Sequence, residues 1–520
     1  MALYKKILIG LGILLILCFV ANYGLNLWVN AKLPKIITEN NVSPYKISYK
    51  NIEIDMWSGS VKADGIVISP KTRPENDTTK MGIYATVKSI EVENFKIWNI
   101  IFNNVIKADQ ITVNTPKVLL YKNTEKAIND RKSINSEVID PIKKIIIVPN
   151  VTLKNGSLNI IYIKNKKAIL SASNINLEVN GIVITDDILK NKIPFSYEKF
   201  DLSTDSLYYQ MDEFYHFQAE NLQTKTSSLK LKNWALVPEY SRKEFTQKLK
   251  TEKDIYDIKG EELSINDMDF GFRDTIFYFN ANKLILDKML ANIYRNKIVA
   301  DDTSKKHLYN KLLRDLKFPL NIDTLTIQNS KLVYEEEVDA KRGPGKLLFN
   351  DFNLNATGLQ SGFGKEKMND VVIDVRSQFM NESPLKVHWT FNVLDKTDGF
   401  HIKGTIFNFN IQALYPFVKD HMNATFKGNL EKVIFNFKGN DKGSAGDFAL
   451  QYKDLDVKLY KKKSPNEENK LTSKVANLLV KDDSSGKTKT TKIEMEREVD
   501  KSFYNLLWKS IAQGLKRILI

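Results

Sequence analysis

The residues that most often perform chemistry in proteins form no recognisable constellation in this sequence. The five histidines are His216, His307, His388, His401 and His421, and none of them has an HExxH or other metal-ligand spacing. Asp267, Asp269 and Gly271 resemble the start of a calcium loop, but Tyr278 stands where the bidentate Glu is required. The glycine-rich segment 358–366 has neither the glycine spacing nor the Ser or Thr of a phosphate loop. We therefore expect no catalytic, metal-binding or cofactor-binding residues and a protein that is not an enzyme.

Most of the chain from Tyr45 onward alternates apolar and polar residues with the period of two that half-buried β-strands show. The alternation slips by one residue between Tyr49 and Ile52, which predicts a β-bulge or a short break. The pair Asn155-Gly156 predicts a hairpin turn, because both residues of such a turn need positive φ. The apolar positions of these strands include Ile52, Ile54, Ile111, Val113, Val151, Leu153, Leu158, Ile160, Leu325 and Ile327. The sequence therefore predicts a mainly β protein.

Two stretches of the chain, 142–162 and 318–337, follow the same pattern roughly 175 residues apart, which indicates two similar β modules. Between them we expect a short helix near Pro238 and a second helix from Asp287 to Leu316. The expected organisation is a transmembrane anchor at 1–30, a first β module at 31–236, a helix-containing connection with strands at 237–320, a second β module at 321–460, a polar linker at 461–500 and an amphipathic helix at 501–520.

Residues 7–29 form a nearly continuous apolar run without a charged side chain. At about 1.5 Å per residue, roughly 20 such residues cross the ~30 Å hydrocarbon core of a bilayer. Lys5 and Lys6 precede the run, so the positive-inside rule leaves the N-terminus in the cytoplasm and the bulk of the chain across the membrane. The alternative is a cleaved signal peptide, for which 29–31 is a poor cleavage site; we expect an uncleaved anchor. Representative anchor residues are Ile7, Leu14, Leu17 and Trp28.

The charge pattern and the cysteine content argue against nucleic-acid binding and against disulfides. The chain carries 77 Lys and Arg against 62 Asp and Glu, a formal net charge of +15. The lysines are spread along the strands among acidic residues, as on solvated faces, so we expect no nucleic-acid binding. The single cysteine, Cys18, lies within the apolar run, so the remainder of the chain has no disulfides.

The last stretch, 501–520, has the spacing of an amphipathic, basic helix. Its expected apolar face consists of Phe503, Leu507, Ile511, Leu515 and Ile518. Two interpretations remain open: the helix makes a second membrane contact or caps a partner, or it packs against the end of the sheet.

Four segments together resemble the AsmA family of envelope proteins, in a form like those of Bacteroidetes. They are the strand-turn-strand 45–69 that follows the single N-terminal anchor, and the segments 88–121, 318–336 and 426–460. The family is related to bridge-like lipid-transfer proteins. The resemblance implies an elongated, curled antiparallel β-sheet whose apolar inner face forms a groove, with a few short helices and no catalytic residues.

The resemblance also implies a function and a location. We expect a single-pass inner-membrane protein, with most of the chain in the periplasm, that binds and conducts phospholipids or other amphiphiles and supports outer-membrane biogenesis. The apolar strand positions named above would line its lipid groove. Its partners would be the inner-membrane bilayer, the lipid and an envelope protein. The alternative hypothesis is a non-transporting envelope scaffold whose β surface holds an assembly partner.

Overall fold

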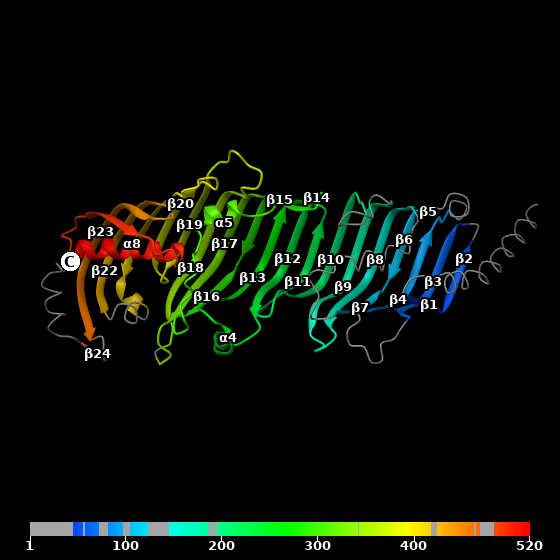
Figure 1. Ribbon diagram of the computed structural model, residues 1–520, viewed down its shortest axis with the longest axis horizontal. Helices are drawn as coiled ribbons and strands as arrows, with labels where there is room; N and C mark the ends of the chain where they lie inside the picture. Colours follow the sequence, from blue (N-terminus) through cyan, green and yellow to red (C-terminus); the bar gives the residue numbers. More distant parts are fainter. Residues whose placement is uncertain are drawn as a thin grey trace, which may run out of the picture. The chain divides into compact units, whose positions relative to one another are not determined.

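The protein is mainly β, with strands in a curved sheet and few helices, as the sequence predicts (Figure 1). The computed structural model describes residues 45–55, 58–71, 82–96, 105–122, 145–185, 188, 195–341, 343–415, 417, 424–461, 464–468 and 483–519. The expected anchor at 1–30, with Ile7, Leu14, Leu17 and Trp28, lies outside these residues. Within them, no helix is both long and apolar enough to cross a bilayer.

The chain divides into two compact units. The first unit comprises Met1–Met211 and Phe217–Thr226, and the second comprises Asp212–His216 and Ser227–Ile520. The first unit contains β1 (Tyr45–Ser48), β2 (Asn51–Asp55), β3 (Ser60–Pro70), β4 (Gly82–Glu93), β5 (Val105–Lys107), β6 (Gln110–Asn114), β7 (Lys117–Lys122), β8 (Ile145–Tyr162), β9 (Ala168–Ile184), β10 (Lys199–Gln210) and most of β11 (Tyr215–Lys225). The break between β1 and β2 confirms the predicted slip between Tyr49 and Ile52.

The second unit adds helices to a similar succession of strands. Its elements are β12 (Ser228–Pro238), α4 (Arg242–Lys248), β13 (Asp254–Asn266), β14 (Asp269–Arg273), β15 (Ile276–Asp287), β16 (Leu290–Asn296), α5 (Tyr309–Arg314), β17 (Leu320–Glu337), β18 (Gly345–Gln360), β19 (Val371–Phe379), β20 (Ser383–Phe391), β21 (Phe400–Asn410), the 3-10 helix η3 (Ile411–Leu414), β22 (Ala424–Gly439), β23 (Gly443–Lys461), β24 (Ser464–Glu468), β25 (Lys489–Glu496) and α8 (Phe503–Leu519). The expected linker at 461–500 thus contains β25, which pairs with β23.

Most neighbouring strands among the described residues are antiparallel, but in each unit one long strand runs parallel to the strands that precede it. In the first unit β8 runs parallel to β6 and β7, and in the second unit β17 runs parallel to β15 and β16. Each of these long strands then pairs in antiparallel fashion with its successor, β9 or β18. The purely antiparallel expectation was therefore wrong at these pairs, because a crossover brings the next strand back in the same direction. Both crossovers precede the strands that repeat in the sequence.

The predicted hairpin at Asn155-Gly156 is also wrong. β8 runs through both residues from Ile145 to Tyr162, with Asn155 at φ 54°. The left-handed residue produces a bulge inside the strand, and the β8–β9 register shifts around Gly156. Thr115, at φ 49°, lies at the same level of the adjacent chain segment, between β6 and β7. The prediction of positive φ was correct for Asn155. No turn forms there because β8 pairs with β6, β7 and β9 on both sides of this residue.

The two helices expected in the middle of the chain fared differently. α4 forms close to the expected place and begins after Ser241, whose side chain and Glu244 form a capping box. The helix expected from Asp287 to Leu316 was wrong over most of its length. That stretch contains the strand β16 and only the short helix α5 (Tyr309–Arg314). β16 forms because its residues pair with both β13 and β17, which overrides their local helical spacing.

A large apolar cluster of the second unit lies beneath α8. It joins residues of β19 to β23, β25 and η3 to Leu308, Phe503, Leu506 and Leu519. In Figure 1, α8 runs across β22 and β23 rather than along them.

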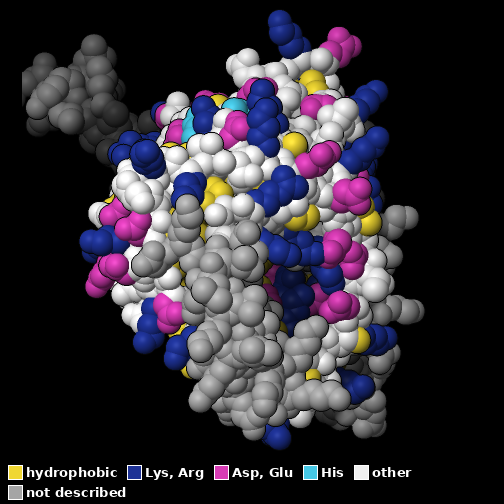
Figure 2. All heavy atoms as spheres, turned by 90° about the vertical axis from the view of Figure 1, so that its left-hand side faces the viewer, with side chains coloured by type: hydrophobic (Ala, Val, Ile, Leu, Met, Phe, Trp, Pro, Cys, Tyr) yellow, Lys and Arg dark blue, Asp and Glu magenta, His cyan; other side chains and the backbone are white. Residues whose placement is uncertain are grey.

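Figure 2 shows the face at this end of the molecule, where basic and acidic side chains are interspersed over the coloured surface. This mixture is what solvated strand faces present.

Candidate functional site

Six of the eight apolar positions singled out in the first unit are brought together in two continuous rows. Strand pairing aligns one row across β2, β3, β4, β6, β8, β9 and β10: Ile54, Val61, Val92, Ile111, Val151, Val179 and Phe200. A second row runs beside it: Ile52, Ala63, Ile90, Val113, Leu153, Leu177 and Leu202. Paired residues of adjacent strands point to the same face, so the two rows make one apolar face. We call it the apolar face of the first unit.

The residues between these rows point to the opposite face and are polar. Along the same seven strands, pairing aligns Glu53, Lys62, Glu91, Thr112, Thr152, Glu178 and Asp201. In the strand register, Lys62 lies opposite Glu53 and Glu91, and Glu178 lies opposite Asp201. The sheet therefore separates an apolar side from a polar side, on which Glu53, Lys62 and Glu178 are exposed and Thr112 is buried.

The apolar face of the first unit is neither a closed core nor fully open to water. Ile54 and Val179 are buried, and the other residues of the two rows are half-buried by one another. The described residues of this unit form strands and their connections, and no helix among them packs on the face. Leu158 and Ile160 lie past the Asn155 bulge, in two further apolar rows with Val118 and Leu120 of β7. A face of this kind can accept apolar groups that lie along it.

The remaining two candidates, Leu325 and Ile327, belong to corresponding rows of the second unit. Ile327 pairs with Leu286 and Leu354, and Leu325 pairs with Leu284 and Ala356. The row of Leu325 continues through Ile373, Trp389, Ile402 and Phe437. It therefore reaches the strands beneath α8, where the apolar side chains become aromatic and buried.

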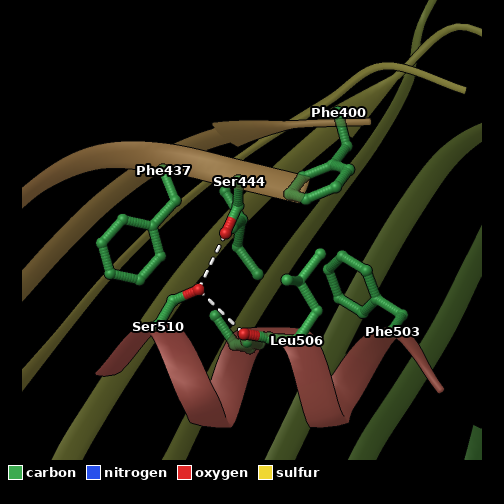
Figure 3. Close-up of a pocket in the computed structure, with 8 residues that line it drawn as sticks. Phe400, Phe437, Ser444, Phe503, Leu506 and Ser510 are labelled. Atoms are coloured by element: carbon green, nitrogen blue, oxygen red, sulfur yellow. Dashed lines mark hydrogen bonds between the residues drawn. The ribbon is translucent and has the colours of Figure 1, made fainter. Parts of the chain in front are cut away.

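At those strands α8 covers the apolar face. Its closest residues are small: the Ser510 hydroxyl lies 2.8 Å from that of Ser444 and donates to the Leu506 carbonyl, and a Cβ on Gly514 would clash with Phe448. Figure 3 shows Phe503 and Leu506 directed from the helix toward Phe400 and Phe437 of the sheet, and no space for a water molecule remains among the lining residues. The ring of Phe503 also stacks on Trp389, 4.5 Å between centroids.

The residues of α8 that are buried most differ from those expected to form its apolar face. Phe503 is buried as expected, but the other buried residues are Leu506, Ser510, Gly514 and Leu519. Leu507, Ile511, Leu515 and Ile518 are half-buried at the margin of the same cluster. The sequence pattern identified the large apolar residues of the helix. The positions closest to the sheet are instead the small residues Ser510 and Gly514, because only small side chains fit there. Packing on the sheet is thus one of the two interpretations of this helix, and the structure realises it.

Two of the histidines singled out in the sequence contact single polar partners rather than one another, and Asp269 contacts Tyr278. His388 contacts Asp374 at 2.8 Å and His401 contacts Asn436 at 2.6 Å, each across a pair of strands. Tyr278 donates a hydrogen bond to Asp269 within the β14–β15 hairpin. In the described part of the chain, no group of three or more His, Cys, Asp or Glu side chains is placed to hold a metal ion.

One buried polar group was missed by the sequence reasoning. Glu335 of β17 accepts hydrogen bonds from Arg242 of α4, at 2.8 and 3.0 Å, and from Asn292 of β16, at 2.7 Å. Burial would raise the Glu335 pKa, but these hydrogen bonds outweigh it and lower the pKa to about 2. The group fastens α4 to the sheet. Only the alternation-breaking acidic run at the end of β17 could have indicated it.

Comparison with known proteins leaves the chain without an assigned family. No protein-family model matches it, and no curated protein matches it either. The resemblance to the AsmA family therefore stays a prediction, and a function has to be argued from the two faces of the sheet.

Proposed function

We propose that the protein binds phospholipid or a similar amphiphile along the apolar face of its sheet and conducts it across successive strands. It does so as a single-pass inner-membrane protein with its bulk in the periplasm, in support of outer-membrane biogenesis. The observation that carries this proposal is the pair of apolar rows that cross seven strands of the first unit without a covering element in the described residues.

The dimensions of this face suit acyl chains. Seven strands at about 4.8 Å spacing span roughly 29 Å, close to the ~30 Å hydrocarbon thickness that both leaflets of a bilayer fill together. An acyl chain lying across the strands would contact apolar side chains along its whole length. Each buried methylene contributes about 0.8 kcal/mol, so a few carbons on this face already outweigh thermal energy.

The polar groups also fit an amphiphile. The rows themselves carry no charged residue, so nothing on the face favours a headgroup. Charged side chains lie on the opposite face and at the sheet edges, where a headgroup would meet water. Because the rows are continuous from strand to strand, a bound chain meets no polar barrier as it moves along them.

The test is lipid co-purification by native mass spectrometry with lipid extraction, on the full chain purified in mild detergent. Val151→Lys places a charge in the middle of an apolar row, and Thr152→Lys places the same charge on the opposite face, next to Glu178. The wild type and Thr152→Lys should carry phospholipid. Val151→Lys should carry about tenfold less, since a cation in hydrocarbon is costly even when it snorkels.

Folding is checked by circular dichroism, because the face is half-buried and a long lysine side chain can reach water from it. A wild-type chain without lipid, together with a Val151→Lys variant that unfolds, would contradict the proposal. That outcome would support the scaffold hypothesis, in which the apolar face is part of a closed core and the protein holds an assembly partner instead.

A further inference from the structure

One edge of the first unit's sheet gathers lysine and tyrosine side chains. β7 ends at Lys122, which pairs with Tyr162 of β8, and β8 turns back into β9 through residues 163–167. Backbone hydrogen bonds of 2.9 Å join Lys166 N–H to the Tyr162 carbonyl and Tyr162 N–H to the Lys167 carbonyl. Pairing of Leu170 with Tyr209 brings the end of β10 to the same edge. We call this the basic edge: Tyr121, Lys122, Lys164, Lys166, Lys167 and Tyr209.

The lysines of the basic edge lack acidic partners in the part of the chain that the structure describes. Lys164, Lys166 and Lys167 are exposed, and neither they nor Lys122 form an ion pair with a described carboxylate. Lys166 instead lies 4.8 Å from the centre of the Tyr121 ring. The residues of the first unit that are described at this edge, 70–71, 82–84, 121–122, 162–168 and 209–211, include no Asp or Glu. Asp212 and Glu213, which follow Met211 in the chain, belong to the second unit. Positive charges held close together repel one another, so an approaching anion lowers their electrostatic free energy.

The opposite edge of the same sheet has a different character. There the strands end near Asp55, Glu93, Asp109 and Glu198, with Lys96, Lys107 and Lys199 among them. Lys96 donates to Asn94, which in turn donates to Asp109, so this edge is internally paired. In sequence, the segments that adjoin the basic edge, 72–81 and 123–144, carry acidic and basic residues in nearly equal number. The excess of positive charge is therefore a property of the basic edge itself.

Tyrosine and apolar side chains accompany the lysines. Tyr209 is 45% exposed and ends an apolar row that runs through Leu170, Ile160 and Leu120. Tyrosine and lysine are the residues that settle at the boundary between headgroups and hydrocarbon. A soluble anion would be satisfied by the lysines alone. The combination with the exposed ring of Tyr209 and the half-buried ring of Tyr121 favours a bilayer surface.

We propose that the basic edge docks the first unit onto the surface of a bilayer that contains anionic phospholipid. The lysines contact headgroup phosphates and the tyrosines lie at the interface, so binding weakens as salt screens the charges. Docking places the apolar row nearest this edge, Leu120, Ile160, Leu170 and Tyr209, alongside the leaflet. Entry of lipid at this edge rests on the proposed function, whereas docking itself does not.

The experiment measures amine labelling of individual lysines by mass spectrometry, with the full chain reconstituted in nanodiscs. The discs contain phosphatidylcholine alone or phosphatidylcholine with phosphatidylglycerol. With phosphatidylglycerol, Lys164, Lys166 and Lys167 should label about threefold more slowly, and 0.5 M salt should remove the difference. Lys107 and Lys199 on the opposite edge should label equally in both discs. Equal labelling of the basic edge in both discs would overturn the proposal.

Two variants separate docking from other causes. Lys164→Glu/Lys167→Glu should abolish the protection of Lys166, whereas Lys107→Glu/Lys199→Glu, with the same change of charge, should keep it. Val151→Lys should also keep it, because docking does not need lipid on the apolar face; loss in that variant would mean that bound lipid, not the bilayer, shields the lysines, and would overturn docking. Equal protection by duplex DNA in phosphatidylcholine discs would likewise refute a bilayer-specific edge.

Discussion

Glu335 is a buried carboxylate whose contribution to stability depends on its charge. Arg242 and Asn292 hold its ionised form, and its pKa of about 2 lies below the ordinary value of 4.5. A depressed pKa stabilises the folded state above the unfolded pKa, and the stabilisation is lost as the pH falls toward the folded pKa. The contribution is thus complete near pH 7 and declines between about pH 4.5 and 2.

Replacing this carboxylate gives the prediction at the residue scale. Glu335→Gln should lower the free energy of unfolding by about 2 kcal/mol at pH 7, because the Arg242 guanidinium loses its anionic partner. The difference from the wild type should shrink by pH 3, where the unfolded carboxyl is already protonated. Urea unfolding in mild detergent at the two pH values measures it. Glu262→Gln, which breaks the exposed pair with Lys230, should cost less than about 1 kcal/mol. A difference for Glu335→Gln that is unchanged at pH 3 would refute the linkage.

Elements of the second unit meet closely where α8 crosses the sheet. A Cβ at position 514 would lie 2.3 Å from Cγ of Phe448, a fully buried ring of β23. Glycine is required there by space, since the helix backbone lies directly on the ring. Ser510 is buried one turn earlier and is satisfied by Ser444 and by the Leu506 carbonyl.

A larger side chain at this contact should therefore loosen the helix. We expect Gly514→Leu to destabilise the docking of α8 by about 2 kcal/mol or more, because overpacking forces the helix or the ring to move. Hydrogen exchange of the α8 amides should accelerate accordingly. Lys516→Leu adds the same side chain at an exposed position of the helix and should leave exchange nearly unchanged. Unaltered α8 exchange in Gly514→Leu would show that the contact is not close in solution.

At the scale of the whole molecule, the two units treat their apolar faces differently. The first unit leaves its apolar face without a covering helix in the described residues, whereas the second covers part of its own with α8 and an aromatic cluster. If lipid binds as proposed, it should protect the two units unequally. Hydrogen exchange of the full chain with and without bound phospholipid should show slower exchange in β6, β8 and β9. β22, β23 and α8 should change little, because their face is already occupied.

Uniform protection of both units, or protection confined to the second, would argue against lipid on the apolar face of the first. The Thr152→Lys variant is the matched control, since it should bind lipid and reproduce the wild-type pattern. Val151→Lys should show neither the lipid nor the added protection in β8.

Local periodicity determined much of this protein from the sequence alone. Alternation predicted a mainly β chain and placed Ile52, Ile111 and Val151 on positions that the sheet aligns, because side chains of a strand point to its two faces in turn. The capped helix α4 and the helix α8 were also foreseen, since their signals lie within a few neighbouring residues.

Tertiary structure decided what depends on distant partners. Asn155 has the positive φ that a turn would need, yet β8 continues through it because its neighbours continue alongside. β8 is parallel to β6 and β7, and β17 is parallel to β15 and β16, because crossovers bring these strands back in the same direction. β16 is a strand because β13 and β17 flank it. The buried stripe of α8 follows small residues such as Gly514, which hydrophobicity does not reveal. Pairing, close contact and cover are properties of two segments at once, and no pattern within one segment fixes them.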